Sequence, residues 1–556
     1  MTSKAPPSEI SEFLRMEFER TGITVISIDT RTYPEETNYI VYVSDTDLSR
    51  GAEIGNALDD DLASQTPRAF VVVRKAPSAM LEAVSPTKLN RGVQDQRATD
   101  LIRLISARSR VSLAQPSLSY VRDVEVNLSA VTAGRHHLIF GRRGAGKTAL
   151  LVEARSQLKR ERSITPWVNV QTLRNEPSSR VVLYVLEELL TSVLAAQQAV
   201  RPESVVAIDL HDIFERIRTL LSSGSSDEKT VLALVPRIQR ALSRFLDIED
   251  ASLYLFLDDF YYLPRDQQPL VLDLLHGCLR DSNAWLKVAS IRHLTRWFES
   301  SPPRGLQTIH DADIIDLDVT LQDPKRAQGF LENVLQRYAA QVGIPVLTRL
   351  FSNRALDRLV LASGAVPRDY LVLASSSIVK AQARSNATLV GAQDVNQAAG
   401  DAMGAKLQEL EDDMASNVGT AQRTLAALKV VRDFCLEEKS YTYFLVNFRD
   451  KEQAPAEYNL LTDLMDVRLV HMLDAGVSDP HAGQKSEAFL LDLSQYSGSR
   501  LKQRIQVLDF SKGRVVARET RIAAPPRIGN TPLQVIAILR RAPTLSLSRL
   551  TEIVHS

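Results

Sequence analysis

A glycine-rich turn between an apolar strand and a helix constrains this chain more than any other feature. The stretch LIFGRRGAGKTAL (138–150) contains Gly141, four further residues, and then Gly146, Lys147 and Thr148. This spacing is typical of a phosphate-binding loop, in which backbone N–H groups point at phosphate oxygens near the positive end of a helix dipole. We expect Lys147 to face the β- and γ-phosphates of a nucleotide and Thr148 to bind Mg²⁺.

The whole turn is expected to hold the nucleotide, because its backbone surrounds the phosphates. Its glycines allow backbone conformations that a side chain forbids. The spacing predicts ATP and Mg²⁺ as the cofactors. The expected binding residues are Gly141, Arg142, Arg143, Gly144, Ala145, Gly146, Lys147, Thr148 and Ala149.

A second apolar run ends in two acidic residues. The stretch LYLFLDDF places Asp258 and Asp259 directly after an expected buried strand. We expect Asp258 to hold Mg²⁺ together with Thr148, and Asp259 to act as the general base that polarises the attacking water. Related enzymes often carry the longer glutamate at the second position, so slow hydrolysis is expected. An acidic turn that only closes a core strand is the structural alternative.

Strands alternate with helices from His136 to about residue 318, which is typical of a buried parallel sheet with helices on both faces. The next hundred residues show only the three- and four-residue spacing of amphipathic helices, including a helix pair around 393–414. Residues 420–500 contain helices followed by a hairpin-like element, which favours a winged-helix module. Its recognition helix is expected over 456–473. Residues 8–75 are expected to run helix, strand, strand, helix, strand.

At 556 residues the chain is too long for one hydrophobic core. We therefore expect a multidomain α/β protein: a P-loop ATPase core with a helical lid, a C-terminal winged-helix-like domain and a small N-terminal α+β domain. The predicted boundaries are 1–80 for the N-terminal domain of unknown role, 81–130 for a linker, 131–318 for the ATPase core, 319–415 for the lid, 416–500 for the winged-helix-like domain and 501–556 for a basic C-terminal extension.

These motifs and their order resemble the AAA+/STAND superclass of ATPases, particularly its origin-recognition-complex-like branch. The resemblance covers about 130–500 and implies two further residues that sense the nucleotide. One is a polar residue at the end of the strand WLKVASI, which is Ser290 here. The other is an arginine at the start of a lid helix, which is Arg368 in GAVPRDY. The resemblance also implies an arginine finger after Ser290, for which Arg292 and Arg296 are candidates. A core-edge serine and solvated arginines are the alternatives.

Net charge says little about partners for the whole chain, since Lys plus Arg and Asp plus Glu each number 67. Its distribution is more informative, because Arg500 to Ser556 carries eleven bases against three acids. Such an excess is typical of phosphate binding and favours double-stranded DNA as a partner of 416–556. The expected recognition helix is poor in bases, which weakens base reading in the major groove. A basic face packed on the protein's own acidic domains is the alternative.

Three functions therefore remain open from the sequence. The first is a nucleotide-controlled switch that binds DNA. The second is a STAND-type signalling or defence ATPase whose terminal domains, including 1–80, bind protein partners. The third is a scaffold that binds ATP structurally and hydrolyses it little. The sequence does not decide whether the chain forms a homo-oligomer.

The sequence indicates a cytoplasmic protein. Its two cysteines, Cys278 and Cys435, are far apart and lie in apolar helical patterns, so neither a disulfide framework nor a zinc motif is indicated. The first twenty residues carry acids where a signal peptide would need an apolar stretch. No apolar run approaches the roughly 20 residues of a membrane span, so no membrane partner is expected.

Overall fold

The computed structural model divides into two compact units, Met1–Asn90 and Arg91–Ser556. Each unit is described by itself. The described residues are 7–555 with the exception of 22, 34–35, 45–46, 63–67, 77–91, 110, 112–126, 199–204, 225–226, 320, 322, 414–417, 479–482, 499–501, 512–513, 521–526 and 530.

The first unit has the element order predicted for 8–75. Its sheet has the order β1-β2-β3, with β1 antiparallel and β3 parallel to β2. Leu14, Phe18 and Val41 lie in its small hydrophobic core. Its elements are α1 (Pro7–Arg20), β1 (Ser27–Thr32), β2 (Glu36–Val43), α2 (Leu48–Leu62) and β3 (Arg68–Lys75).

The second unit contains the predicted parallel sheet. Its five strands run parallel in the order β10-β4-β7-β6-β5. Because β4, β7 and β6 are adjacent, their carboxyl ends lie together at one edge of the sheet, where α/β proteins bind ligands. The strands are β4 (His136–Phe140), β5 (Trp167–Asn169), β6 (Leu253–Asp258), β7 (Ala284–Ser290) and β10 (Ala312–Asp316).

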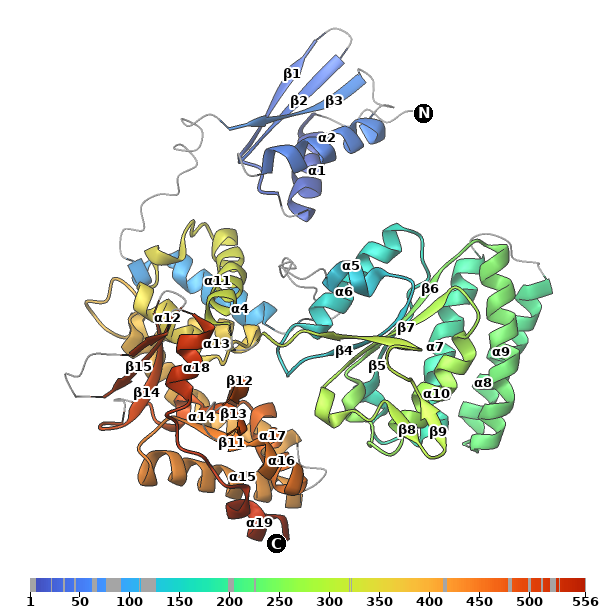
Figure 1. The fold of residues 1–556 in the computed structure, drawn as a ribbon. Helices are drawn as coiled ribbons and strands as arrows, with labels where there is room; N and C mark the ends of the chain where they lie inside the picture. Colours follow the sequence, from blue (N-terminus) through green and yellow to red (C-terminus); the bar gives the residue numbers. More distant parts are fainter. Residues whose placement is uncertain are drawn as a thin grey trace. The chain divides into compact units, whose positions relative to one another are not determined.

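Helices cover both faces of this sheet (Figure 1). Successive strand residues point to opposite faces, so β4 gives Leu138 to one core and Ile139 to the other. The first face carries α7 (Ser178–Gln198), α8 (Val205–Ser223), α9 (Glu228–Ile248) and α10 (Gln268–Leu279), and the second carries α5 (Asn127–Thr132) and α6 (Lys147–Arg160). A short hairpin, β8 (Phe298–Ser300) and β9 (Pro303–Gly305), precedes β10.

Helices follow the sheet, as predicted for the lid. They are α11 (Pro324–Gln341), α12 (Asn353–Ala362), α13 (Pro367–Gln382) and α14 (Ala392–Asp413). The expected helix pair around 393–414 is wrong, because α14 is one continuous helix. Gly400 does not interrupt α14. It allows the helix to pack closely against Gly498, because a Cβ at residue 400 would lie 3.0 Å from the Cα of Gly498.

A three-stranded antiparallel sheet with the order β11-β13-β12 follows the lid. The helix expected over 456–473 is wrong in its second half, because α17 ends at Asp466 and β12 begins at Val470. Between them Arg468 has a φ of 60°, a left-handed conformation that ends the helix. The elements are α15 (Val418–Asp433), β11 (Tyr443–Asn447), α16 (Phe448–Gln453), α17 (Pro455–Asp466), β12 (Val470–Ser478) and β13 (Lys485–Leu491).

The described residues of 502–555 are a folded part of the unit, which corrects their description as an extension. Leu508, Phe510 and Leu545 are buried, and backbone hydrogen bonds join Leu445 to Pro543 and Leu545. The elements are β14 (Gln506–Ser511), β15 (Arg514–Glu519), β16 (Arg527–Gly529), α18 (Pro532–Leu539) and α19 (Thr551–His555).

One hydrophobic core joins the lid to everything that follows it. The same cluster of buried side chains contains Leu331 and Tyr370 from the lid, Phe444 from β11 and Leu550 near the C-terminus. It also contains Leu101 from α4 (Gln96–Arg108), so this helix packs with the lid although it falls in the expected linker. The remainder of that linker lies largely outside the described residues.

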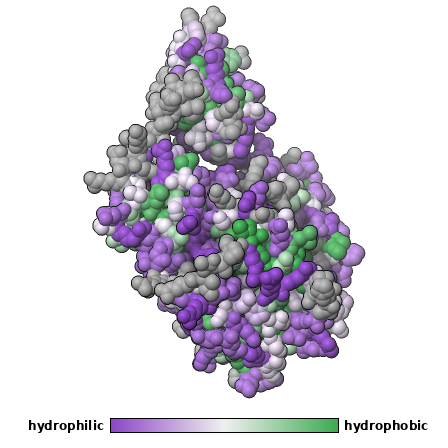
Figure 2. Space-filling view, turned by 60° about the vertical axis from the view of Figure 1, so that its left-hand side comes forward, coloured by the Kyte–Doolittle hydropathy of each residue, from purple (hydrophilic) through white to green (hydrophobic). Residues whose placement is uncertain are grey.

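The face of the molecule seen in Figure 2 is mainly polar. Hydrophilic residues dominate there, and hydrophobic residues form small patches among them. Among the described residues, no helix is both long enough and apolar enough to cross a bilayer. Cys278 and Cys435 are free and buried.

A buried ion pair anchors β14 to the lid and gives a stability test. Asp509 accepts a hydrogen bond of 2.9 Å from Arg358, whose side chain is 5% exposed. Asp509→Ala leaves that guanidinium buried without its carboxylate, so we expect the free energy of unfolding to fall by about 3 kcal/mol. Chemical denaturation of the full chain measures the loss. Asp401→Ala, which removes an exposed partner of Lys380, is the control and should cost less than about 1 kcal/mol.

Candidate functional site

The glycine loop (141–148) connects the end of β4 to the start of α6. Gly144 and Gly146 have φ angles of 79° and 103°, which glycine adopts far more readily than other residues. Gly146 is the N-cap of α6, so the free N–H groups of the first helical turn face the space beside the loop. The Nζ of buried Lys147 donates hydrogen bonds to the carbonyl oxygens of Gly141 (2.7 Å) and Arg142 (3.2 Å).

Two carboxyl groups lie opposite this lysine. Thr148 Oγ1 donates to Asp258 Oδ2 over 2.9 Å, which brings together the two residues predicted to bind Mg²⁺. Asp259 follows in a left-handed conformation with a φ of 56°. Burial raises the pKa of both carboxyls, and the charge of Asp259 raises that of Asp258 further, while Lys147 opposes both shifts. A bound divalent cation would relieve the repulsion between these two groups.

The loop lines a cavity of about 960 Å³, large enough for a nucleotide. Asp259 lies in its wall, and Pro367 and Arg368 at the start of α13 form part of the wall on the lid side. Of the loop residues predicted to bind the nucleotide, those that line the cavity are Arg143, Gly144, Ala145, Gly146, Lys147, Thr148 and Ala149. The glycine conformations, the helix N-terminus, the buried lysine and the paired carboxyls fit ATP with Mg²⁺.

Arg368 lies directly against the glycine loop. Its backbone N–H points at the carbonyl oxygen of Gly144 over 3.4 Å. A Cβ built on Gly144 would lie 2.8 Å from the Cβ of Arg368 and 3.0 Å from Val366. The loop can therefore meet the lid this closely only because residue 144 has no side chain.

Arg142 turns away from the cavity and contacts the lid instead. Its guanidinium donates to the carbonyl oxygens of Val319 (3.0 Å) and Gly364 (3.2 Å). Gly364 in turn lies against His471 of β12, since a Cβ there would be 2.1 Å from the imidazole Nδ1. Arg142 thus links the loop to a glycine that packs on the C-terminal part of the unit.

Sequence reasoning missed several residues in the wall of the cavity. Arg143 lies over the ring of Tyr261, 5.4 Å from its centroid, and Tyr261 itself lines the cavity. Lys406 of α14 and Arg468 also line it, and Arg468 pairs with Asp369 over 3.1 Å. The three aromatic residues directly after Asp259 were a local signal, whereas Lys406 and Arg468 reach the cavity through tertiary packing alone.

The remaining predicted residues lie at the sheet edge. Ser290 ends β7 and is paired in register with Phe140, but its buried hydroxyl contacts Thr295 Oγ1 over 2.6 Å. Thr295 uses its own proton to bind the carbonyl oxygen of Ile291, so Ser290 is the donor in this pair. The arginine-finger candidates have partners within the chain: Arg292 pairs with Asp316 over 3.5 Å and Arg296 with Glu299 over 2.8 Å.

A family model described as ORC-CDC6-like matches residues 174–363. The match covers about a third of the chain, so it shows what this region is similar to. The matched region contains Asp258, Asp259 and Ser290, while the glycine loop precedes it and Arg368 follows it. The five-stranded parallel sheet with a glycine loop after β4 is like the core of AAA+ P-loop proteins.

Two solved structures also align with the chain. The Aeropyrum pernix Orc1 protein in complex with DNA is 14% identical, with 74% of this chain and 92% of that chain covered and a TM-score of 0.31. A Thermotoga maritima RuvB mutant is 12% identical, with 65% and 88% covered and a TM-score of 0.28. Because both scores are low, these similarities support no conclusion about domain arrangement or ligands. A search of curated proteins found no match.

The contact between Gly144 and Arg368 gives a direct test of the cavity. Gly144→Ala places a Cβ 2.8 Å from that of Arg368 and requires a left-handed alanine, so the loop and α13 must separate. We expect ATP affinity to fall at least tenfold, measured with a fluorescent ATP analogue. Gly329→Ala on α11 meets no atom within 4 Å and serves as the control, with unchanged affinity. Equal affinities for both variants would contradict the assignment of this cavity to the nucleotide.

Proposed function

We propose that this chain is an ATP- and Mg²⁺-dependent AAA+ ATPase that acts as a nucleotide-controlled switch. One observation carries the proposal: the loop that would hold the phosphates contacts Arg368 in the first turn of α13. A γ-phosphate in the cavity would give Arg368 a charged partner that ADP lacks. The nucleotide state would thereby set the position of the lid, which shares its core with the C-terminal part.

The residues of the chain have distinct roles in this proposal. Lys147 and the N-terminal N–H groups of α6 bind and orient the phosphates. Thr148 and Asp258 hold Mg²⁺, which when bound neutralises developing negative charge on the phosphates. Asp259 orients and polarises the attacking water, and its short side chain favours slow turnover. Ser290 holds its place at the edge of the sheet through Thr295.

Two substitutions separate nucleotide binding from hydrolysis. Lys147→Ala removes the charge that faces the β- and γ-phosphates, so ATP binding should be lost. Asp259→Asn keeps the size of the side chain but removes the base, so binding should persist while hydrolysis falls by roughly 10²-fold or more. Binding is measured by equilibrium titration and hydrolysis by phosphate release. Unchanged ATP affinity in Lys147→Ala would show that the nucleotide binds elsewhere.

We infer that residues 418–491 form a winged helix. Their elements follow the order helix, strand, helix, helix, strand, strand, and the first strand pairs with the last. In this interpretation α17 is the recognition helix, and its acids Glu457, Asp463 and Asp466 disfavour base reading. We therefore propose that contact with DNA is made mainly to phosphates, by the bases that follow residue 499.

Only some of those bases are available to DNA. Lys502, Arg518 and Arg549 pair with Glu437, Asp509 and Glu438 of the same chain. Arg500, Lys512 and Arg521 lie outside the described residues. Five further arginines are exposed, namely Arg504, Arg514, Arg527, Arg540 and Arg541. Of these, Arg540 donates a hydrogen bond to the carbonyl oxygen of Ser478.

Two of the exposed arginines act on the same buried side chain. Burial raises the pKa of Tyr443, and the charges of Arg527 and Arg541 both oppose that shift. They are the strongest described candidates for phosphate contact, and Arg514 at the start of β15 adds a third exposed charge.

DNA binding is tested with the full chain and a random duplex at several salt concentrations. We expect a complex at low salt that weakens by about 0.9 log units per phosphate contact for each tenfold rise in salt. Combined replacement of Arg514, Arg527 and Arg541 by alanine should weaken binding and flatten that slope. Combined replacement of Arg160, Arg237 and Arg265, which are exposed on the ATPase core, removes the same charge and should preserve the slope.

The absence of any complex at low salt would contradict the DNA proposal. The signalling alternative would then be favoured, and the first unit would be tested as the protein-binding part by removing 1–80. The ATP proposal is independent of this result, because it concerns the cavity alone.

A further inference from the structure

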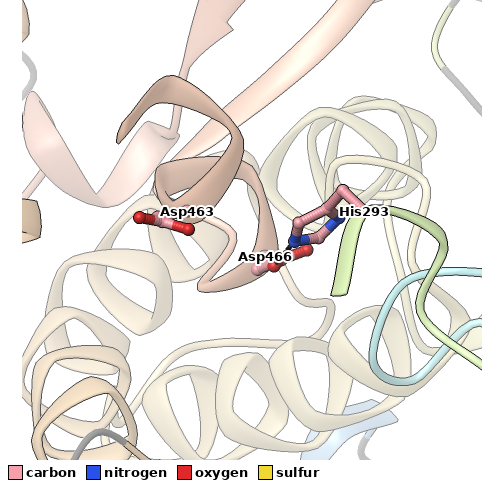
Figure 3. A group of neighbouring side chains, drawn as sticks. All are labelled: His293, Asp463 and Asp466. Atoms are coloured by element: carbon pink, nitrogen blue, oxygen red, sulfur yellow. Dashed lines mark ion pairs between the residues drawn. The ribbon is translucent and has the colours of Figure 1, made fainter. Parts of the chain in front are cut away.

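Three side chains with metal-binding atoms lie together where the core meets α17. His293 belongs to a short 3₁₀ helix, Arg292–Leu294, directly after β7, and Asp463 and Asp466 belong to α17. The imidazole nitrogen and the carboxylate oxygens all lie within 4.8 Å of one another. Figure 3 shows Asp466 beside His293, with Asp463 on the preceding turn of the same helix.

The spacing within α17 places both carboxylates toward the same imidazole. Residues three apart in a helix lie on one face, so Asp463 and Asp466 approach His293 from one side. His293 Nε2 is fully buried and forms an ion pair with Asp466 Oδ2. The Asp466 side chain is 14% exposed, so the ion pair lies mostly out of the solvent.

The cluster brings one imidazole and two carboxylates together. Both carboxylates lie near the imidazole of His293, and Asp466 forms an ion pair with it. A divalent cation between the three groups would be bound by all of them.

The donor set indicates which cation fits. One imidazole nitrogen and two carboxylate oxygens suit a borderline transition-metal ion such as Zn²⁺, whose fourth position water can fill. Mg²⁺ prefers an octahedral set of oxygen ligands and fits an imidazole poorly. We propose that His293, Asp463 and Asp466 form a Zn²⁺-binding site that ties the ATPase core to α17.

The site would crosslink two parts of the second unit. His293 follows the strand that ends in Ser290, whereas both carboxylates come from the helix inferred to be the recognition helix of the winged helix. If that proposed function holds, the bound ion keeps the acidic face of α17 on the core and away from DNA. The metal site itself requires neither ATP nor DNA, so its test is independent of theirs.

Zn²⁺ binding is measured on the full chain, stripped with a chelator and free of nucleotide, by equilibrium dialysis against ZnCl₂. We expect one high-affinity ion per chain that excess Mg²⁺ does not displace. His293→Ala and Asp463→Asn should each weaken the affinity at least tenfold. The controls His310→Ala and Asp266→Asn change exposed residues of the same kinds on the core and should leave the affinity unchanged.

Asp463→Asn keeps the shape of the side chain and the ion pair between His293 and Asp466, so a loss of Zn²⁺ in this variant reports ligation and not misfolding. Hydrogen exchange provides a second measurement: Zn²⁺ should slow exchange of the amides in α17 in the wild-type protein but not in Asp463→Asn. Absence of a stoichiometric ion in the wild-type protein, or wild-type affinity in either site variant, would overturn the proposal. Lys147→Ala should retain Zn²⁺, which separates this site from the nucleotide cavity.

Discussion

Close backbone contact at two glycines is the constraint on which the region around the cavity depends. Gly144 lets the glycine loop meet α13, and Gly364, between α12 and α13, lets the lid meet His471. Either contact would be impossible with a side chain at the glycine, because the built Cβ atoms overlap their neighbours. Since Arg142 donates to the carbonyl oxygen of Gly364, the loop is connected to both contacts. The cavity is therefore enclosed by the sheet edge and the lid together.

Charge inside the cavity is balanced only in part. Burial lowers the pKa of Lys147, while Asp259, Asp318 and Asp258 raise it, so the lysine remains matched to nearby carboxyls. Its ammonium is also satisfied by two carbonyl oxygens of the loop. A phosphate would compete with these carbonyls for the same protons, and a metal ion would compete with Lys147 for the same carboxyls. Carbonyl oxygens therefore take the role of the phosphate here, and Lys147 takes the role of the metal ion.

The sequence predicted the sheet, the glycine loop and the lid helices, because continuous apolar runs and helical spacing are local signals. It failed where long-range contacts decide the structure. Arg468 pairs with Asp369 and takes a left-handed conformation there, which ended a helix whose apolar pattern continued. The prediction after residue 499 rested on the number of basic residues, and it overlooked the apolar residues that form the buried side of β14 and β15. His293 and its two aspartates are distant in sequence, so no spacing rule could bring them together.

The single core shared by the lid and the C-terminal part has a mechanical consequence. Packed cores transmit strain, so a change in the position of α13 would be passed to the elements that share its core. In the switch proposed above, a rotation of α13 against the glycine loop would therefore move the lid and the C-terminal part together as one body.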